Sequence, residues 1–156
     1  MRAVSYYTHQ GAPTPTRRSR LRAALLGRTR WHEATELPLV RRVALFHPDL
    51  PEAFDGLRIA QVADVHAGAF MPPGRIARVR GLVEGMSPDL VVFTGDQLDR
   101  RDIDAELFVH GFAGITAPLG ALGILGNHDH LAGPSLALAA LDAIGVRQTW
   151  QVKSPD

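Results

Sequence analysis

The sequence contains no cysteine, and it has no apolar stretch long enough to cross a membrane. Without cysteine the chain cannot form disulfides, a thiolate zinc site or a cysteine nucleophile. A membrane-spanning helix needs about 18 or more consecutive apolar residues, which no stretch approaches. A twin-arginine export signal is disfavoured because the apolar run after Arg17-Arg18 stops at Gly27, short of the roughly 7–15 residues that a signal needs. The expected location is cytoplasmic or membrane-associated.

Acidic residues are scarce at the start of the chain. Nine of the 17 basic residues precede Val43, and all nine are arginines, whereas only Glu33 and Glu36 are acidic there. Because this stretch is also rich in turn residues and has no helical apolar stripe, we expect residues 1–36 to form a disordered basic tail. Such a tail attracts phosphates or an anionic membrane surface, so peripheral membrane contact is expected. It lacks interleaved aromatic residues, so no specific nucleic-acid binding is predicted.

The rest of the chain has the composition of a globular domain. The 156 residues are 46% hydrophobic and 21% charged, which fits one domain with a substantial core. From Val43 onward, 14 acidic residues stand against eight basic ones, which suits a body built around a cation site. We therefore expect residues 37–156 to form this domain.

Apolar runs alternate with amphipathic segments along the domain. Three runs typical of buried strands cover residues 57–63, 90–93 and 121–125. Three segments with helical spacing cover residues 75–86, 105–115 and 135–144. An edge strand is predicted at 39–46 and a further strand from Val146. This alternation predicts an α/β fold of βαβ units with a mostly parallel sheet.

Each of the three apolar runs ends in a polar turn. The side chains of these turns that suit metal binding or catalysis are Asp64 and His66, then Asp96, then Asn127, His128 and Asp129. Asp64 and Asp96 are 32 positions apart, and Asp96 and Asn127 are 31 apart, so one such turn recurs in each βα unit. Because the carboxyl ends of parallel strands meet at one edge of the sheet, the three turns should converge on one crevice.

The residue types in these turns suit two cations. Asp64 and His66 lie two positions apart at a strand end, so they point the same way and can share one metal. Asp96 offers two carboxylate oxygens that can bridge metals about 3.5–4 Å apart, and Asn127 offers a neutral oxygen to the second metal. Such a pair activates a bridging water and stabilises charge during in-line displacement, which is the chemistry of phosphoester hydrolysis.

His128 follows a predicted ligand without being needed as one. An imidazole at this point can hydrogen-bond phosphoryl oxygens or protonate a leaving alkoxide. Asp129, the next residue, can orient its ring. We therefore predict His128 and Asp129 as the catalytic pair.

These motifs together resemble the calcineurin-like metallophosphoesterase superfamily. They are Asp64-x-His66, Gly95-Asp96-x-x-Asp99 and Gly126-Asn127-His128-Asp129. Their surroundings resemble a bacterial branch, some of whose members act on phosphodiesters or lipid-linked pyrophosphates. The resemblance implies an αββα sandwich, a phosphoester or lipid-linked substrate, and two divalent or trivalent metal ions, usually manganese, iron or zinc. It assigns the metals to Asp64, His66, Asp96 and Asn127, and the catalytic role to His128.

The chain departs from the family pattern after Gly145. The family completes its site with a further histidine and a Gly-His-x-His motif, and this sequence has neither. We therefore expect half of the αββα sandwich, a domain truncated at its C-terminus, exposed apolar surface, and one metal or none in this chain alone. Two functions stay open: a metal-dependent phosphoester hydrolase, or a non-catalytic remnant that binds at most one metal weakly.

Overall fold

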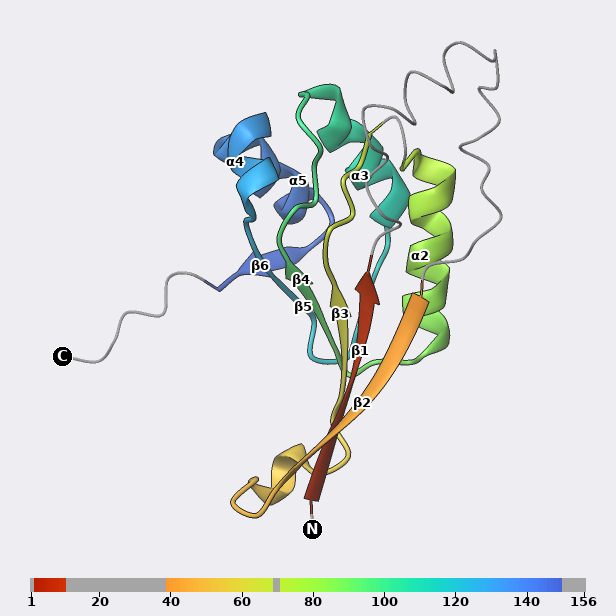
Figure 1. The fold of residues 1–156 in the computed structure, drawn as a ribbon, viewed down its shortest axis with the longest axis vertical. Coiled ribbons are helices and arrows are strands. Elements are labelled where there is room, and N and C mark those ends of the chain that lie inside the picture. The colour runs from red at the N-terminus through yellow and green to blue at the C-terminus, as the bar shows by residue number, and fades with distance from the viewer. Residues whose placement is uncertain (1, 11–38, 69–70, 150–156) are drawn as a thin grey trace, which may run out of the picture.

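Six strands form one sheet in the order β2-β1-β3-β4-β5-β6 (Figure 1). The computed structural model describes residues 2–10, 39–68 and 71–149. The strands are β1 (Arg2–Gln10), β2 (Leu39–His47), β3 (Arg58–Val62), β4 (Leu90–Thr94), β5 (Ala121–Ile124) and β6 (Val146–Gln148). All neighbouring pairs are parallel except the β1–β2 pair at one edge, which is antiparallel. The predicted α/β fold with a mostly parallel sheet is confirmed, and β2 is the expected edge strand.

Helices link the consecutive parallel strands β3 to β6. The long helices are α2 (Pro73–Gly85), α3 (Ile103–Phe112) and α5 (Pro134–Ala143). Two short elements, η2 (Glu52–Phe54) and α4 (Asn127–Ala132), complete the described part. Each predicted helix is present with ends shifted by one to three residues, and α4 replaces what the sequence indicates only as a turn.

Local chemistry accounts for the helix boundaries. Pro73 stands in the first turn of α2, where its missing N–H costs nothing. The Asp102 side chain accepts a hydrogen bond from the Ile103 N–H at 2.8 Å, so α3 begins two residues before the predicted start. Gly145 follows α5 with a φ of 77°, a left-handed conformation that glycine adopts without steric cost.

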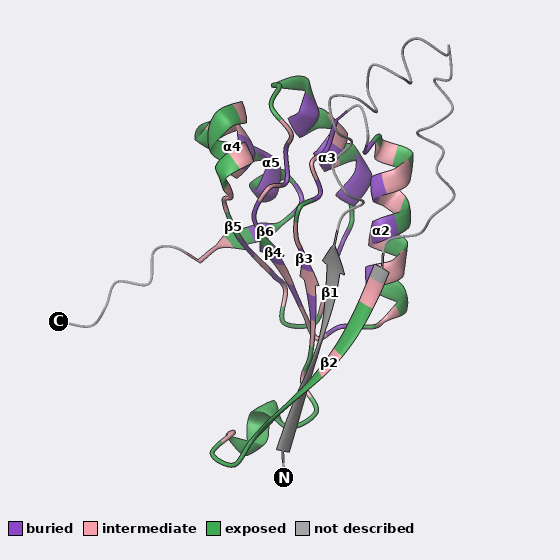
Figure 2. Cartoon of the chain, viewed as in Figure 1, coloured by how far each residue is buried: buried purple, intermediate pink, exposed green. Residues whose placement is uncertain are grey.

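The core lies between the helices and one face of the sheet. Alternate residues along β3, β4 and β5 are buried, and they belong to the same apolar cluster as the inner faces of α2, α3 and α5 (Figure 2). Parallel crossovers are right-handed, and strands 3 to 6 follow one another in order, so each helix falls on the same face. The cluster includes Ala60, Val62, Val91 and Phe93 from the strands, and Ile76, Phe108, Phe112 and Leu141 from the helices.

The opposite face of the sheet has no covering layer among the described residues. Ile59, Val92 and Leu122 are only partly buried, and Ile124 is 41% exposed. A parallel sheet ordinarily carries cover on both faces, because its strands are apolar on both. The expected exposed apolar surface is therefore present.

Strand β1 corrects the expectation of a disordered tail over residues 1–36. It pairs with β2 on one side and with β3 on the other, in register from Ser5 opposite Arg58 to His9 opposite Val62. The β-branched and aromatic run Val4-Ser5-Tyr6-Tyr7-Thr8 has strand propensity, and the two ladders supply its backbone hydrogen bonds. Residues 11–36 lie outside the described residues, and the domain assigned to residues 37–156 stays a prediction.

Candidate metal centre

The loops after β3 and β4 lie side by side at the carboxyl edge of the sheet. The Asp64 N–H donates to Gly95 O at 3.1 Å, and the His66 N–H donates to Asp96 O at 2.9 Å. A further bond joins Ala67 N to the carbonyl of the residue after Asp96 at 2.8 Å. The first two predicted turns therefore continue the parallel pairing of their strands.

Three of the predicted ligands have left-handed backbones. The φ angles are 55° at Asp64, 46° at His66 and 56° at Asp96, and among the described non-glycine residues only Ser87 joins them. Left-handed residues other than glycine cost on the order of 1–3 kcal/mol each, and they persist where surrounding contacts hold them. Here the hydrogen bonds between the two loops hold them. Such strain gathers at functional sites, which marks this edge as the candidate site.

The turn after β5 packs closely against the turn after β4, and the contact is made by Gly126 and Gly95. A Cβ atom on Gly126 would stand 2.2 Å from Asp96 Oδ1 and 2.4 Å from Asp96 N. A Cβ on Gly95 would meet the Gly126 backbone at 2.9 Å, and Gly95 has a φ of 105°. Neither position has room for a side chain, so both glycines are needed to bring His128 beside Asp96.

His66, Asp96 and His128 form a cluster in which one ligand atom from each lies within 4.8 Å of the others. His66 Nε2 is 3.8 Å from Asp96 Oδ2, and the two imidazole rings meet edge to face with centroids 4.4 Å apart. All three side chains are partly buried. Two nitrogens and one carboxylate oxygen are a donor set that suits zinc, iron or manganese.

Asp99 lies beside both histidines. His128 Nδ1 is 2.9 Å from the Asp99 backbone carbonyl and 3.5 Å from its carboxylate, and His66 Nδ1 is 3.9 Å from the same Oδ1. A carbonyl can only accept, so His128 Nδ1 carries a hydrogen and donates it. In the sequence, the position of Asp99 three residues after Asp96 in the Gly-Asp-x-x-Asp motif is the signal for this residue.

Asp129 supports the backbone of two neighbouring loops. Its side chain is fully buried and accepts hydrogen bonds from the Leu98 and Gly126 N–H groups, both at 2.9 Å. Burial raises the pKa of Asp129 above its usual value, the two backbone hydrogen bonds lower it, and the nearby Asp96 carboxylate raises it. In this structure the His128 Nδ1 contacts Asp99, and the catalytic role of Asp129 stays a prediction.

Asp64 and Asn127 are placed less closely than the sequence predicts. Both are exposed, and Asp64 does not join the cluster of His66, Asp96 and His128. Asn127 is the first residue of α4, directly after the glycine that packs on Asp96. Their assignment as metal ligands stays a prediction.

Asp104 is a buried carboxylate that the sequence analysis missed. It accepts hydrogen bonds from Arg100 N at 3.1 Å and from Arg101 N at 2.9 Å, and it forms an ion pair with the Arg101 guanidinium at 3.1 Å. Asp104 is thus the anchor of the loop that begins at Asp99. An aspartate in the first turn of a helix gives no distinguishing signal in the sequence.

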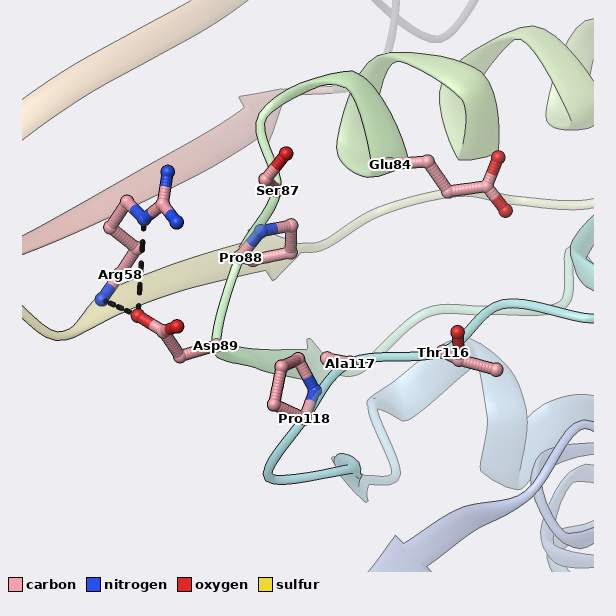
Figure 3. A pocket seen from close by; sticks show the side chains of 8 residues that line it. All are labelled: Arg58, Glu84, Ser87, Pro88, Asp89, Thr116, Ala117 and Pro118. Carbon is pink, nitrogen blue, oxygen red and sulfur yellow. Dashed lines mark hydrogen bonds and ion pairs between the residues drawn. The ribbon is translucent and has the colours of Figure 1, made fainter.

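A hollow of about 560 Å³ lies at the opposite, amino-terminal edge of β3 and β4 (Figure 3). Its walls include Arg58, Glu84, Ser87 and Asp89. The Arg58 backbone N–H donates to Asp89 Oδ2 at 2.8 Å, and the Arg58 side chain forms an ion pair with the same oxygen at 3.9 Å. No cluster of metal-type ligands lies here among the described residues.

Comparison with known proteins identifies related sequences. The family model described as calcineurin-like phosphoesterase matches residues 57–152. The chain is 36% identical over 105 residues to UDP-2,3-diacylglucosamine pyrophosphatase LpxG of Chlamydia trachomatis, covering 64% of this chain and 32% of that one. An uncharacterized metallophosphoesterase of Aquifex aeolicus is 30% identical over 116 residues, or 74% of this chain and 44% of the relative. The metallophosphoesterase YkuE of Bacillus subtilis is 35% identical over 83 residues, or 52% and 29%.

The matches therefore span less than half the length of each of these relatives. No solved structure gives a significant match. None of the helices in the described part of the chain has the length and apolar character that a membrane crossing needs.

Proposed function

Because the chain belongs to the calcineurin-like phosphoesterase family, we propose that its carboxyl-edge site takes part in metal-dependent hydrolysis of phosphoesters. The observation that carries the proposal is the cluster of His66, Asp96 and His128, whose ligand atoms lie within 4.8 Å of one another. Three separate strand-end loops supply these side chains. A site built from distant segments, with strained backbones at its ligands, has the features of a catalytic centre.

The residues present fit a metal. His66 Nδ1 is buried and makes no hydrogen bond among the described residues, and His66 Nε2 faces the Asp96 carboxylate. In this proposal Asp64, His66 and Asp96 hold one ion, while Asp96 and Asn127 contribute to a second. Bound metal would supply Lewis acidity toward a phosphoryl oxygen and an activated water. Manganese, iron and zinc all suit this mixture of imidazole and carboxylate.

His128 acts in the proposal as the general acid. With its Nδ1 hydrogen directed at the Asp99 carbonyl, Nε2 is the atom that would give a proton to the leaving alkoxide. The Asp99 carboxylate, 3.5 Å from Nδ1, would stabilise the ring in its protonated form. Asp129 supports the loops through its two backbone hydrogen bonds.

The proposed substrate class is a phosphoester, with lipid-linked phosphoesters as one member. The printed name of the Chlamydia trachomatis relative specifies a UDP-linked diacylglucosamine and a pyrophosphatase activity. That name supports the substrate class for this chain without defining the substrate. The predicted contact between the basic segment and an anionic membrane falls mainly on residues outside the described part and stays a prediction.

A second candidate function is metal binding without turnover. The described residues contain one group of three metal-type ligands. In the two-metal arrangement, the second ion would have only Asp96 and Asn127 from these loops, and two protein ligands hold an ion weakly compared with the three of a typical catalytic site.

Hydrolysis of an aryl phosphodiester in added manganese separates the two functions. We expect the wild-type chain to hydrolyse it, and Asp96→Asn to lower the rate by at least about 100-fold, since the loss touches both proposed metals. Asp142→Asn is the matched control, because Asp142 is an exposed carboxylate on α5. Equal rates in wild type and Asp96→Asn would contradict the proposal, and metal uptake without hydrolysis would favour the second function.

A further inference from the structure

We propose that Asp104 is a positioning residue for His128 and acts through the peptide group that joins Asp99 to Arg100. The inference rests on the proposed function, in which His128 is the general acid and Asp99 is its partner. Asp104 does not belong to the cluster of metal-type ligands that the described residues form. Its effect on the reaction is therefore indirect, through the orientation of the His128 ring and the position of the ring's hydrogen.

One peptide group lies between Asp104 and His128. Its carbonyl belongs to Asp99 and accepts a hydrogen bond from His128 Nδ1 at 2.9 Å. Its N–H belongs to Arg100 and donates to Asp104 Oδ2 at 3.1 Å. Because a trans peptide group is planar, its carbonyl and its N–H point in opposite directions. The bond to Asp104 therefore fixes the direction in which the carbonyl meets the imidazole ring.

The Asp104 side chain is itself held in place by several hydrogen bonds. It is fully buried, and besides the Arg100 N–H it accepts the Arg101 N–H at 2.9 Å and the Arg101 guanidinium at 3.1 Å. The Asp104 backbone N–H donates to the Arg101 carbonyl at 3.1 Å, which closes the turn that leads into α3. A buried carboxylate that loses its donors costs free energy, so this side chain stays turned toward the loop.

The loop after β3 holds Asp99 from its other side. The Asp99 N–H donates to the Ala67 carbonyl at 3.2 Å. A Cβ atom on Gly68 would lie 3.4 Å from Asp104 Oδ1 and 3.4 Å from Asp99 Cβ, so the Gly68 backbone packs against both side chains. Both peptide groups of Asp99 are thus fixed, one by Ala67 and the other by Asp104.

The negative charge of Asp104 acts on the ring through the same peptide group. Hydrogen bonds in a chain polarise one another, and a low local dielectric strengthens them. A carboxylate that accepts the N–H of a peptide group therefore makes its carbonyl a better acceptor. The Asp99 carbonyl then holds the Nδ1 hydrogen of His128 more firmly, which leaves Nε2 as the nitrogen that gives up a proton in the proposed reaction.

Nitrogen-15 NMR of the full metal-free chain tests the inference without relying on hydrolysis. In a neutral imidazole the ring nitrogen shifts distinguish the Nδ1–H tautomer from the Nε2–H tautomer. We expect His128 to carry its hydrogen on Nδ1 in the wild type, and we expect Asp104→Ala to move that hydrogen, in whole or in part, to Nε2. His130 is an exposed histidine on α4, so it is the internal reference, and its shifts should not change.

Three matched variants should keep the Nδ1–H tautomer. Asp104→Asn retains an oxygen that can accept the Arg100 N–H. Arg101→Gln removes the guanidinium partner and leaves both backbone bonds to Asp104 in place. Asp102→Ala removes the cap of α3 at Ile103 and leaves Asp104 unchanged. If Asp104→Ala does not fold by circular dichroism, Asp104→Ser takes its place, and the same shift is expected because a serine hydroxyl lies nearer the backbone than a carboxylate oxygen.

Hydrolysis of the aryl phosphodiester gives the second readout. We expect folded Asp104→Ala to lower kcat by about 10- to 100-fold with little change in KM, since general acid catalysis contributes roughly 10²–10⁴-fold. An unchanged tautomer and an unchanged kcat in this variant, even with lower stability toward urea, would overturn the inference and leave the proposed function intact. A shifted tautomer in a chain whose wild type does not hydrolyse the ester would support the positioning of His128 and contradict the proposed function.

Discussion

His128 and Asp99 are joined through one ring nitrogen, with Nδ1 2.9 Å from the Asp99 carbonyl oxygen and 3.5 Å from its carboxylate. The carbonyl contact survives any substitution of the side chain, but the carboxylate contact does not. The pair therefore separates two effects on the histidine: the tautomer, which the carbonyl sets, and the stabilisation of the charged ring, which the carboxylate adds.

The first prediction concerns that carboxylate. Asp99→Asn keeps the backbone carbonyl and removes the negative charge, so we expect the ring to stay in place while its protonated form loses support. Hydrolysis of an aryl phosphodiester should fall by about 10- to 100-fold with little change in KM, because general acid catalysis contributes about that much or more. A raised KM with unchanged kcat would assign Asp99 to substrate binding instead.

The second prediction concerns the contact between Gly126 and Asp96. Gly126→Ala would place a Cβ 2.2 Å from Asp96 Oδ1, so the loops must separate. We expect a loss of about 1–3 kcal/mol in the free energy of unfolding, as for overpacked sites, and a loss of metal binding. Urea unfolding and Co²⁺ titration measure the two effects.

Gly81→Ala is the control for that substitution. Gly81 lies inside α2, and a Cβ there meets nothing within 4 Å. Alanine is favoured over glycine in a helix interior by up to about 1 kcal/mol, so this variant should be slightly more stable and bind metal as the wild type does. If both variants have the same stability and bind metal equally well, the close approach of Gly126 to Asp96 is not required for the metal site.

The third prediction concerns Asp104. Asp104→Ala removes the carboxylate acceptor of two partly buried hydrogen bonds, from the Arg100 and Arg101 N–H groups, and a hydrogen bond to a charged group contributes about 1.5–3 kcal/mol. The loop that begins at Asp99 should loosen, so hydrogen exchange at these two amides should accelerate. Asp102→Ala is a useful comparison, because Asp102 is an exposed residue that caps α3 at Ile103 and should affect the helix start alone.

The fourth prediction concerns the pH dependence of stability through Asp129. Its pKa is raised in the folded chain relative to the ordinary value of 3.8, chiefly by burial. The folded state therefore holds this proton more tightly than the unfolded state, and the free energy of unfolding from this group falls as pH rises from 3.8 through the folded-state pKa. Asp129→Asn should lack this fall.

Urea unfolding of metal-free protein at successive pH values measures the effect. The amide of the variant does not titrate, so we expect the free energy of unfolding of the wild type, minus that of the variant, to fall as pH rises above 3.8. A difference that grows with pH would mean that burial does not dominate the pKa of Asp129.

Strand β1 shows where local patterns fall short for the fold. The runs at β3, β4 and β5 are apolar enough to be recognised alone, and glycine or proline marks their ends. β1 lies between β2 and β3. Its residues pair with residues about 30 to 50 positions later in the chain: Arg2 lies opposite His47 in β2, and His9 lies opposite Val62 in β3. Its backbone hydrogen bonds come from these distant strands. The composition of residues 1–36 alone therefore could not predict the strand.

In the candidate metal centre, too, local sequence patterns determined some features and tertiary packing decided others. The sequence by itself determined which residue types stand at the strand ends and that Asp64, His66, Asp96, Asn127 and His128 approach one edge, because side-chain period and strand direction are local properties. Only the tertiary structure decided which of them touch. Close packing of Gly126 on Asp96 brings His128 to Asp99 and turns Asp129 into the buried support of two backbone amides. Neighbours along the chain share a turn, but the partner of a side chain is set by the packing of separate loops.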